Sequence, residues 1–477
     1  MSTTRFQSQA SEEARPSAPK VHIVTFGCQM NKYDSMLAEG RFEQHGYATT
    51  ARMDEADVIL FNTCSVREHA EERTYSWLGE IKRAKESRPE LVIGVMGCMA
   101  QRVEEEVFRR AGHVDLVVGT REFQRLPELV AELRERRDHP ERHERAASRI
   151  LATDTGLEVE VDRSDETYRG GRHAYLAVMR GCDLQCTYCI VPATRGRVQS
   201  RPIEALVAEA RWLVSEGVQV ITLLGQTVNS YGEDFDAPGA GEARSLGRGG
   251  RPSLADLLRE LEGIEGLERI RLITLHPAYL STALAEAVRD CPKVDRFLPL
   301  PAQSGSDAVL KAMKRGYNLD LYRGRIRELR AIVPDIELGS DWIVGFPGES
   351  DADFEASEAF LTEMGFVVNY VFKYDPRPTT RSAENMPDIV PTEVKKERNR
   401  RLLEVSSRVG LGRMSAYVGR EVRAFLEDPS ERRPGTLSGR THQGLPIQVE
   451  AGEELLGTDV DIIVEHATAF GLSGRLT

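Results

Sequence analysis

Three cysteines within eight residues constrain this chain more than any other stretch of its sequence. Cys182, Cys186 and Cys189 have the spacing C-x3-C-x2-C and follow directly on the apolar run 174–179. A loop this short can place three thiolates around one face of a [4Fe-4S] cluster, which usually has four cysteine ligands. Three ligands leave one iron without a protein partner, as a catalytic zinc keeps an open position. Such an iron can bind and reduce a small molecule.

A structural zinc site or a disulfide loop is the alternative interpretation of these cysteines. Zinc would need a fourth Cys or His nearby, and none lies within the next several residues of the sequence. The spacing resembles the signature of radical S-adenosylmethionine (SAM) enzymes, in which an aromatic residue, here Tyr188, precedes the third cysteine. The cluster is therefore the favoured interpretation.

Length and composition indicate an ordinary soluble protein of several domains. A chain of 477 residues predicts two to four domains, each with a core of its own. No apolar run approaches the roughly 20 residues that span a membrane, and the polar segment 1–19 lacks the apolar core of a secretory signal. We therefore expect a disordered tail over 1–19 and a cytoplasmic protein. The net charge of −12 does not by itself indicate a nucleic-acid partner.

Residues 20–140 alternate short apolar stretches with amphipathic ones, which predicts a doubly wound parallel sheet. The first three predicted strands are followed by Cys28, Cys64 and Cys98. Carboxyl ends of parallel strands lie along one edge of a sheet, where ligands bind. One buried cysteine is usually only a small apolar residue. Three at equivalent positions predict a second iron–sulfur cluster, again with three protein thiolates.

The segment 141–172 is polar and is predicted to be a linker, and 173–411 then contains about six strand–helix units. Six such units predict a partial (β/α)6 barrel whose chemistry lies at the carboxyl ends of its strands. Cys182 follows the first of these strands. Cys291 lacks nearby partners and is interpreted as a structural thiol.

Polar groups and glycines after the other barrel strands could bind SAM, because glycine lets the backbone approach a ligand closely. The candidate cofactor-binding residues are Tyr188, Gly225, Gln226, Gln303, Ser304 and Asp341.

Residues 412–477 contain short β segments separated by glycines, which predicts a small antiparallel β-barrel. The preceding stretch 392–413 reads as one long basic helix. It is either a solvated face or a surface for RNA phosphates.

Nine motifs, taken in order, resemble the methylthiotransferase family of radical SAM enzymes across nearly the whole chain. They are Phe26-Gly-Cys-Gln-Met-Asn31, Asn62 to His69, Gly97-Cys98, Cys182 to Cys189, Val191-Pro192 with Thr194-Arg195-Gly196, Leu224 to Gln226, Pro301 to Ser306, Ile343 to Glu349 and Leu437 to Thr441. Members of this family have a methylthiotransferase N-terminal domain, a radical SAM partial barrel and a TRAM domain. Thr227, where Asn is usual, and Ala302, where Val is common, depart from the family pattern. Neither is a predicted cluster ligand.

The first cysteine motif distinguishes branches of this family. Gly-Cys-Gln-Met-Asn is similar to the branch that acts on isopentenylated adenosine, whereas Gly-Cys-Pro-Lys-Asn is typical of the ribosomal-protein branch and Gly-Cys-Lys-Val-Asn of the threonylcarbamoyl-adenosine branch. The resemblance implies two [4Fe-4S] clusters and two SAM per turnover. One SAM would be reduced to a 5′-deoxyadenosyl radical at the cluster on Cys182, Cys186 and Cys189. The other would methylate sulfur held at the cluster on Cys28, Cys64 and Cys98.

The implied substrate is N6-isopentenyladenosine at tRNA position 37, modified at C2 to the 2-methylthio product. Implied partners are tRNA, an electron donor such as flavodoxin or ferredoxin, and a sulfur donor; no membrane is involved, and the protein is expected to be a monomer. Two other classes stay open: methylthiolation of a protein, and an iron–sulfur RNA-binding or sensing module without turnover.

Overall fold

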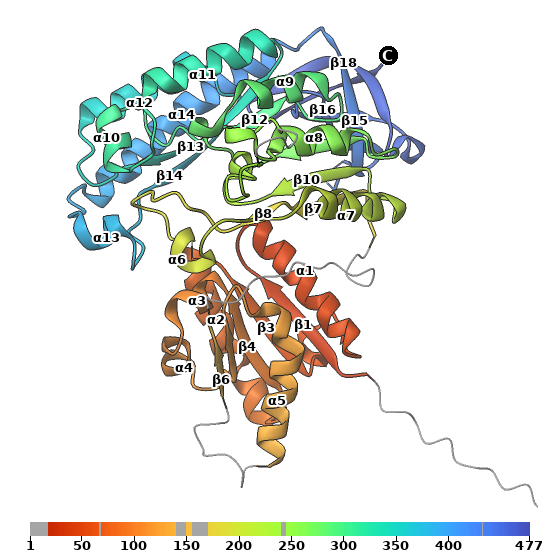
Figure 1. The fold of residues 1–477 in the computed structure, drawn as a ribbon, viewed down its shortest axis with the longest axis vertical. Helices are drawn as coiled ribbons and strands as arrows, with labels where there is room; N and C mark the ends of the chain where they lie inside the picture. Colours follow the sequence, from red (N-terminus) through yellow and green to blue (C-terminus); the bar gives the residue numbers. More distant parts are fainter. Residues whose placement is uncertain (1–17, 66–67, 140–148, 155–169, 240–244, 432) are drawn as a thin grey trace, which may run out of the picture.

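The computed structural model describes residues 18–65, 68–139, 149–154, 170–239, 245–431 and 433–477. Figure 1 shows an N-terminal α/β part below, a central barrel above it and a small β-barrel beside the central one. The predicted tail over 1–19 lies almost entirely outside the described residues. Within these ranges, no helix combines the length and the apolar character needed to cross a membrane.

The N-terminal part is a six-stranded parallel sheet of order β2-β1-β3-β4-β5-β6. Every residue of β3 and β4 is buried, as expected for parallel strands covered on both faces. Apolar side chains of α1 and α5 pack on one face, and those of α2 and α4 on the other. The predicted doubly wound sheet is thus confirmed. Its elements are β1 (Lys20–Thr25), α1 (Gln29–Gln44), β2 (Ala48–Thr49), β3 (Val58–Thr63), α2 (Glu68–Ser87), β4 (Val92–Gly97), α3 (Cys98–Val103), α4 (Glu106–Arg110), β5 (Leu116–Val118), α5 (Leu126–Asp138) and β6 (Ile150–Ala152).

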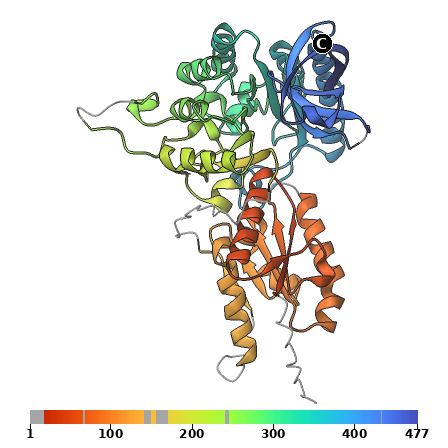
Figure 2. The same ribbon diagram turned by 90° about the vertical axis from the view of Figure 1, so that its right-hand side faces the viewer.

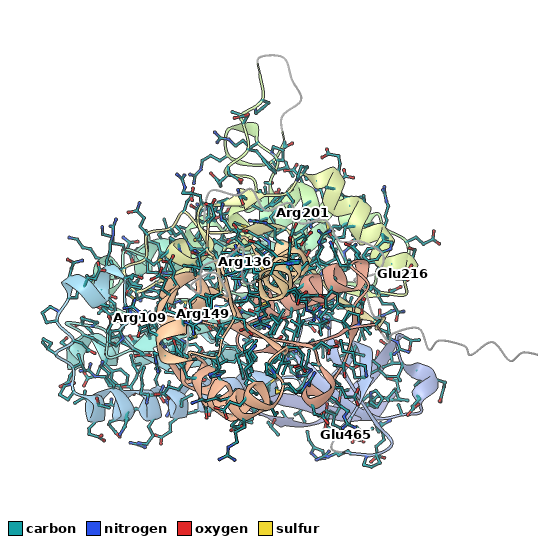
Figure 3. The ribbon with its side chains drawn as sticks, turned by 90° about the horizontal axis from the view of Figure 1, so that it is seen from below. Arg109, Arg136, Arg149, Arg201, Glu216 and Glu465 are labelled. Carbon is teal, nitrogen blue, oxygen red and sulfur yellow. The ribbon has the colours of Figure 1, made fainter. Side chains whose placement is uncertain are left out.

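The sixth strand lies inside the segment predicted to be a linker. β6 pairs in parallel with β5, with Ile150 opposite Leu116. Just before it, the Arg149 carbonyl accepts a hydrogen bond of 3.5 Å from Arg136 of α5, and the Arg149 guanidinium donates to the Gly112 carbonyl at 2.5 Å (Figure 3). The linker prediction for 141–172 is therefore wrong at these residues. A strand of three residues next to a charged stretch has too few apolar positions to show the alternation by which strands are predicted.

The central part has six parallel strands in two sheets, β11-β10-β7 and β12-β13-β14. A single bridge between Ile270 and Val294 links the two sheets, and each strand of the predicted partial barrel has its counterpart. Helix boundaries follow local chemistry: α12 begins at a capping box of Ser350 and Asp353 and ends at Gly365 in the left-handed conformation. The elements are β7 (His173–Ala177), β8 (Met179–Arg180), α6 (Val191–Arg195), β9 (Gln199–Ser200), α7 (Ile203–Ser215), β10 (Val220–Leu224), α8 (Leu254–Glu262), β11 (Arg269–Leu272), α9 (Thr282–Asp290), β12 (Phe297–Pro299), α10 (Asp307–Ala312), α11 (Leu319–Ile332), β13 (Glu337–Val344), α12 (Asp351–Met364), β14 (Val368–Lys373) and α13 (Arg381–Asn385).

The long basic helix, α14 (Thr392–Ser415), crosses the predicted domain boundary at 411/412. Several of its cations pair with acidic groups of the barrel. Arg398 lies 2.7 Å from Glu349, Arg401 lies 2.6 Å from Glu358, and Arg413 lies 2.7 Å from Glu337. These basic side chains hold α14 against the barrel, which leaves fewer of them for RNA phosphates than the sequence alone suggests.

The C-terminal part is a closed five-stranded barrel of order β15-β16-β17-β19-β18, as the small-barrel prediction requires. Its strands are β15 (Glu421–Pro429), β16 (Thr436–Thr441), β17 (Pro446–Glu450), β18 (Asp459–Thr468) and β19 (Gly471–Leu476). The prediction of an antiparallel barrel is wrong for one pair of strands, because β19 runs parallel to β17. That pair closes the barrel.

The C-terminal barrel contacts the amino ends of the central strands, opposite the edge where Cys182 lies. Arg271 of β11 donates to Glu427 of β15 at 2.5 and 2.9 Å and to Asp295 at 3.1 Å. Arg269 donates to Asp459 of β18. Figure 2 shows the small barrel beside the central one, with the N-terminal part beneath. The carboxyl ends of the strands therefore remain on the side of the N-terminal part.

Replacing Arg271 by Gln tests this junction. The substitution removes the cation paired with the largely buried Glu427 and leaves Asp295 with its longer, 3.9 Å pair to Arg269. We expect a loss of about 3 kcal/mol in the free energy of unfolding, near the lower end for a broken buried pair. Urea unfolding followed by circular dichroism measures it. Arg423→Gln is the control, since its 65% exposed side chain pairs with Asp459 at the surface and should contribute less than about 1 kcal/mol. Equal losses in both variants would contradict the expectation.

Candidate cluster and cofactor site

The loop that carries Cys182, Cys186 and Cys189, here called the radical SAM loop, begins after β8 with a turn that favours glycine. Gly181, after β8, has φ of 74°, and an added Cβ would lie 1.9 Å from the Arg197 carbonyl oxygen. The turn brings the Cys182 amide within 3.1 Å of the Gly196 carbonyl, and the Cys189 amide within 3.1 Å of the Cys186 carbonyl. The loop is thus folded back on itself at the carboxyl end of the first barrel strands.

Two polar side chains contact the sulfur atoms of this loop. The Oγ1 of Thr227 lies 3.5 Å from the Cys182 Sγ. A buried guanidinium, Arg315, places Nη1 at 3.3 Å from both the Cys186 Sγ and the Tyr188 hydroxyl. Arg315 was not among the predicted site residues, because an arginine between a lysine and a glycine after a short helix has the pattern of a surface turn. Its position gives the loop a fixed positive charge.

The second set of cysteines lies at one edge of the N-terminal sheet. Cys28 precedes α1, Cys64 follows β3 and Cys98 begins α3 after β4. Gly27 has φ of 128°, and a Cβ added there would lie 2.7 Å from the Cys64 Cβ, so the first two loops are in close contact. Cys64 and Cys98 are buried, whereas Cys28 is exposed.

Burial controls the protonation of several of these thiols. It raises the pKa of Cys98 and Cys182, and it raises that of Cys189 to about 12 with a further contribution from Cys186. At neutral pH these thiols therefore hold their protons until a metal displaces them.

The donor sets fit [4Fe-4S] clusters better than single ions or disulfides. In the described part of the chain, which includes all seven cysteines, each cysteine is free, and no group of three or more Cys, His, Asp or Glu side chains is close enough to hold one metal ion. A structural zinc needs four ligands around one atom. In a [4Fe-4S] cluster each thiolate binds a different iron, so the sulfurs can lie further apart.

Gly225 and Gln226 follow β10 next to the radical SAM loop. A Cβ added to Gly225 would lie 2.6 Å from the Met179 side chain, so glycine permits this packing. Gln226 carries a buried Oε1 without a hydrogen-bond partner among the described residues. Buried acceptors are normally satisfied, which makes this oxygen a candidate contact for a bound cofactor.

The other candidate cofactor residues lie on the second half of the barrel. Gln303 has φ of 66°, and its amide donates to the Asp341 carbonyl at 2.9 Å. Asp341 is half-buried on β13 beside Trp342, which packs in the helix-side core, so alternation directs Asp341 to the barrel interior. Ser304 faces elsewhere: its Oγ lies 3.4 Å from that of Ser357 on α12.

A neutral histidine also lies in the central barrel, after β11 of the first sheet. His276 is buried, its Nδ1 accepts from the Ala278 amide, and its ring lies 5.4 Å from that of Tyr317. Burial, aided by Arg315, lowers the pKa of His276 to about 2, so the imidazole is uncharged. A single histidine in the sequence does not by itself predict a buried, uncharged position of this kind.

One short helix connects the two cysteine sites. α6 follows Cys189 and contacts the N-terminal part, where the Thr194 carbonyl accepts a 2.5 Å hydrogen bond from the Thr120 hydroxyl. Arg195, the last residue of α6, lies 2.9 Å from Asp34 of α1. Figure 1 shows α6 at the junction, above α3.

Known families match both α/β parts. Residues 20–119 match the model of the uncharacterized protein family UPF0004, and residues 176–361 match that of the radical SAM superfamily. Among solved structures, the chain resembles the radical S-adenosylmethionine methyltransferase TsrM from Kitasatospora setae with cobalamin and a [4Fe-4S] cluster bound. The TM-score is 0.55 over 88% of this chain and 80% of that one, at 14% identity, which shows a similar fold.

Two relatives match nearly the full length of the chain. The tRNA-2-methylthio-N(6)-dimethylallyladenosine synthase of Rhodopirellula baltica is 39% identical over 473 residues, covering 96% of this chain and 95% of that protein. The synthase of the same name from Xanthomonas oryzae pv. oryzae is 40% identical over 469 residues, covering 97% and 93%. The chain therefore belongs to the family of tRNA-2-methylthio-N(6)-dimethylallyladenosine synthases, within the radical SAM superfamily.

Proposed function

We propose that this protein is a tRNA methylthiotransferase that converts N6-isopentenyladenosine (N6-dimethylallyladenosine) at position 37 to its 2-methylthio derivative. The observation that carries the proposal is the pair of three-cysteine sites, each at the carboxyl ends of parallel strands and joined through α6, in a chain related over its length to synthases of that name. An anticodon-loop base suits such a site, since unstacked bases can be splayed into a pocket.

Cys182, Cys186 and Cys189 would hold one [4Fe-4S] cluster, and Cys28, Cys64 and Cys98 the second. When bound, the clusters and two SAM per turnover would supply one-electron chemistry, sulfur and a methyl group that no side chain can provide. The protein's own groups position these parts. Arg315 fixes the Cys186 sulfur and Tyr188, Gln226 offers an unsatisfied acceptor, and Asp341 faces the interior.

Gly225 and Gln303 would shape the same cofactor site through their backbones, whereas the Ser304 side chain acts indirectly, by fixing the loop against α12. The domain that would carry the second cluster would then include β6, which pairs with β5, in addition to the predicted residues 20–140. An electron donor such as flavodoxin or ferredoxin, and a separate sulfur donor, would serve a monomeric enzyme.

Cysteine replacements should separate the two sites. Cys64→Ala should abolish the methylthio product while 5′-deoxyadenosine still forms from SAM, and Cys186→Ala should abolish both. Each loss should exceed the roughly 10- to 100-fold typical of removing a group that only supports a metal ligand. Mass spectrometry of tRNA nucleosides and chromatography of 5′-deoxyadenosine, after anaerobic incubation of reconstituted protein with SAM and reductant, give the two readings.

Cys291→Ala is the matched control, because this buried thiol lies in the core of the central barrel. It should keep both activities. Full product from Cys64→Ala would refute the two-cluster assignment. Failure of the unmodified protein to form 5′-deoxyadenosine would favour a sensing module without turnover.

The substrate is tested by offering two tRNAs, one carrying N6-isopentenyladenosine and one N6-threonylcarbamoyladenosine. We expect a methylthio mass gain on the first alone. A mass gain only on the tRNA with N6-threonylcarbamoyladenosine would support methylthiolation but contradict the proposed substrate. With 5′-deoxyadenosine formed and neither tRNA modified, a protein substrate would become the better proposal.

A further inference from the structure

Two buried arginines share one buried carboxylate beside the second cysteine site. Arg180 Nη1 lies 2.8 Å from Asp34 Oδ1, and Arg195 Nη2 lies 2.9 Å from Asp34 Oδ2. All three side chains are at most 7% exposed. Two guanidiniums against one carboxylate leave a net positive charge in a place that water barely reaches. Burying an uncompensated charge is costly, so this arrangement calls for an anion.

Among the described residues, Asp34 is the carboxylate that pairs with Arg180 and Arg195, and no second one does. Arg180 has its Nε and Nη2 buried without hydrogen-bond partners in the same part of the chain, and its guanidinium lies over the rings of Tyr33 and Phe123 at 5.8 and 5.2 Å. Arg121 also contacts this group, with Nη2 3.4 Å from the Arg195 carbonyl. The neighbouring Glu122 forms a 2.7 Å pair with Arg125.

The positive group lies against the cysteines. Arg195 Nη2 and the Cys28 Sγ lie 3.4 and 3.2 Å from the same oxygen, the Asn31 Oδ1. Asn31 is held in turn by hydrogen bonds from its Nδ2 to Asn62 and to the Thr63 carbonyl, next to Cys64. Burial alone would lower the pKa of Arg195, yet the carboxylate of Asp34 raises it. The guanidinium therefore stays charged and within electrostatic reach of these thiols.

We propose that Arg195, with Arg180 and Asp34, sets the charge balance of the cluster on Cys28, Cys64 and Cys98 and thereby its reduction potential. The inference rests on the second cluster of the proposed function. A [4Fe-4S] core of charge 2+ bound by three thiolates carries one net negative charge, and reduction adds another. Cluster potentials follow net charge, burial and hydrogen bonds to sulfur, so a buried positive neighbour favours the reduced form.

Arg195 is a positioning residue in this scheme, and it connects the two cysteine sites. It ends α6, the helix that directly follows the loop with Cys182, Cys186 and Cys189, but its charge acts at the other cysteine site. An ion pair between Arg195 and Asp34 would also be needed if it only held the N-terminal and central parts together. A structural role and an electrostatic role differ, because only the electrostatic one predicts opposite shifts of the cluster's reduction potential when either partner is neutralised.

The test uses the full-length protein with Cys182, Cys186 and Cys189 replaced by Ala, so that only the second site can hold a cluster. Arg195→Gln, Arg195→Lys and Asp34→Asn are added singly, and each protein is reconstituted and titrated anaerobically with the reduced cluster followed by electron paramagnetic resonance. Arg398→Gln is the matched control, since it breaks a buried arginine–carboxylate pair on α14, away from this site.

We expect Arg195→Gln to shift the midpoint potential to more negative values and Asp34→Asn to shift it to more positive ones. Arg195→Lys and Arg398→Gln should stay within the scatter of replicate titrations. Loss of the cluster in Arg195→Gln with retention in Arg195→Lys would also support a requirement for charge. Equal or same-direction shifts in Arg195→Gln and Asp34→Asn, or loss of the cluster in the Lys variant too, would overturn the proposal in favour of a structural role. If no cluster forms before any of these substitutions, the two-cluster assignment itself fails.

Discussion

The contact between α6 and the N-terminal sheet is the interaction on which the arrangement of both cysteine sites depends. Parallel sheets bind ligands at the carboxyl ends of their strands. In this protein that edge of the N-terminal sheet meets the same edge of the central barrel. Gly181 folds the radical SAM loop back, and Gly196, with φ of 74°, ends α6 against Arg121. The third cysteine and the Asp34–Arg195 ion pair are thus fixed by one short stretch of chain.

The opposite end of the central barrel is used for stability instead. Ion pairs from Arg269 and Arg271 hold the C-terminal barrel at the amino ends of the strands. α14 extends this junction, because Arg413 pairs with Glu337 at the start of β13. The division between a stabilised end and a reactive end is the usual one for barrels of this kind.

The sequence predicted the repeating features of the fold well. Strands such as β3 and β4 are mostly apolar because both faces of a parallel sheet are buried, and the cysteines after them mark its edge. β6 was not predicted, because three residues are too few to show an apolar period and the strand is ordered by its pairing with β5.

The candidate site could be predicted only in part. Cysteine spacing locates possible cluster ligands, but the roles of Arg315 and Arg195 come from tertiary contacts over more than a hundred residues of sequence. The direction of a side chain such as Ser304, which faces α12, follows from a left-handed backbone at Gln303 that a sequence does not display.

The late position of α6 in the chain has a consequence for synthesis. Domains emerging from the ribosome fold from the amino terminus. The N-terminal sheet can be complete once β6 has emerged, but its cysteine edge is closed only after α6 follows. During that interval Cys98, whose helix α3 contacts α6 in the finished fold, lacks its cover from the central part, so its thiol is more accessible in the nascent chain than in the folded protein.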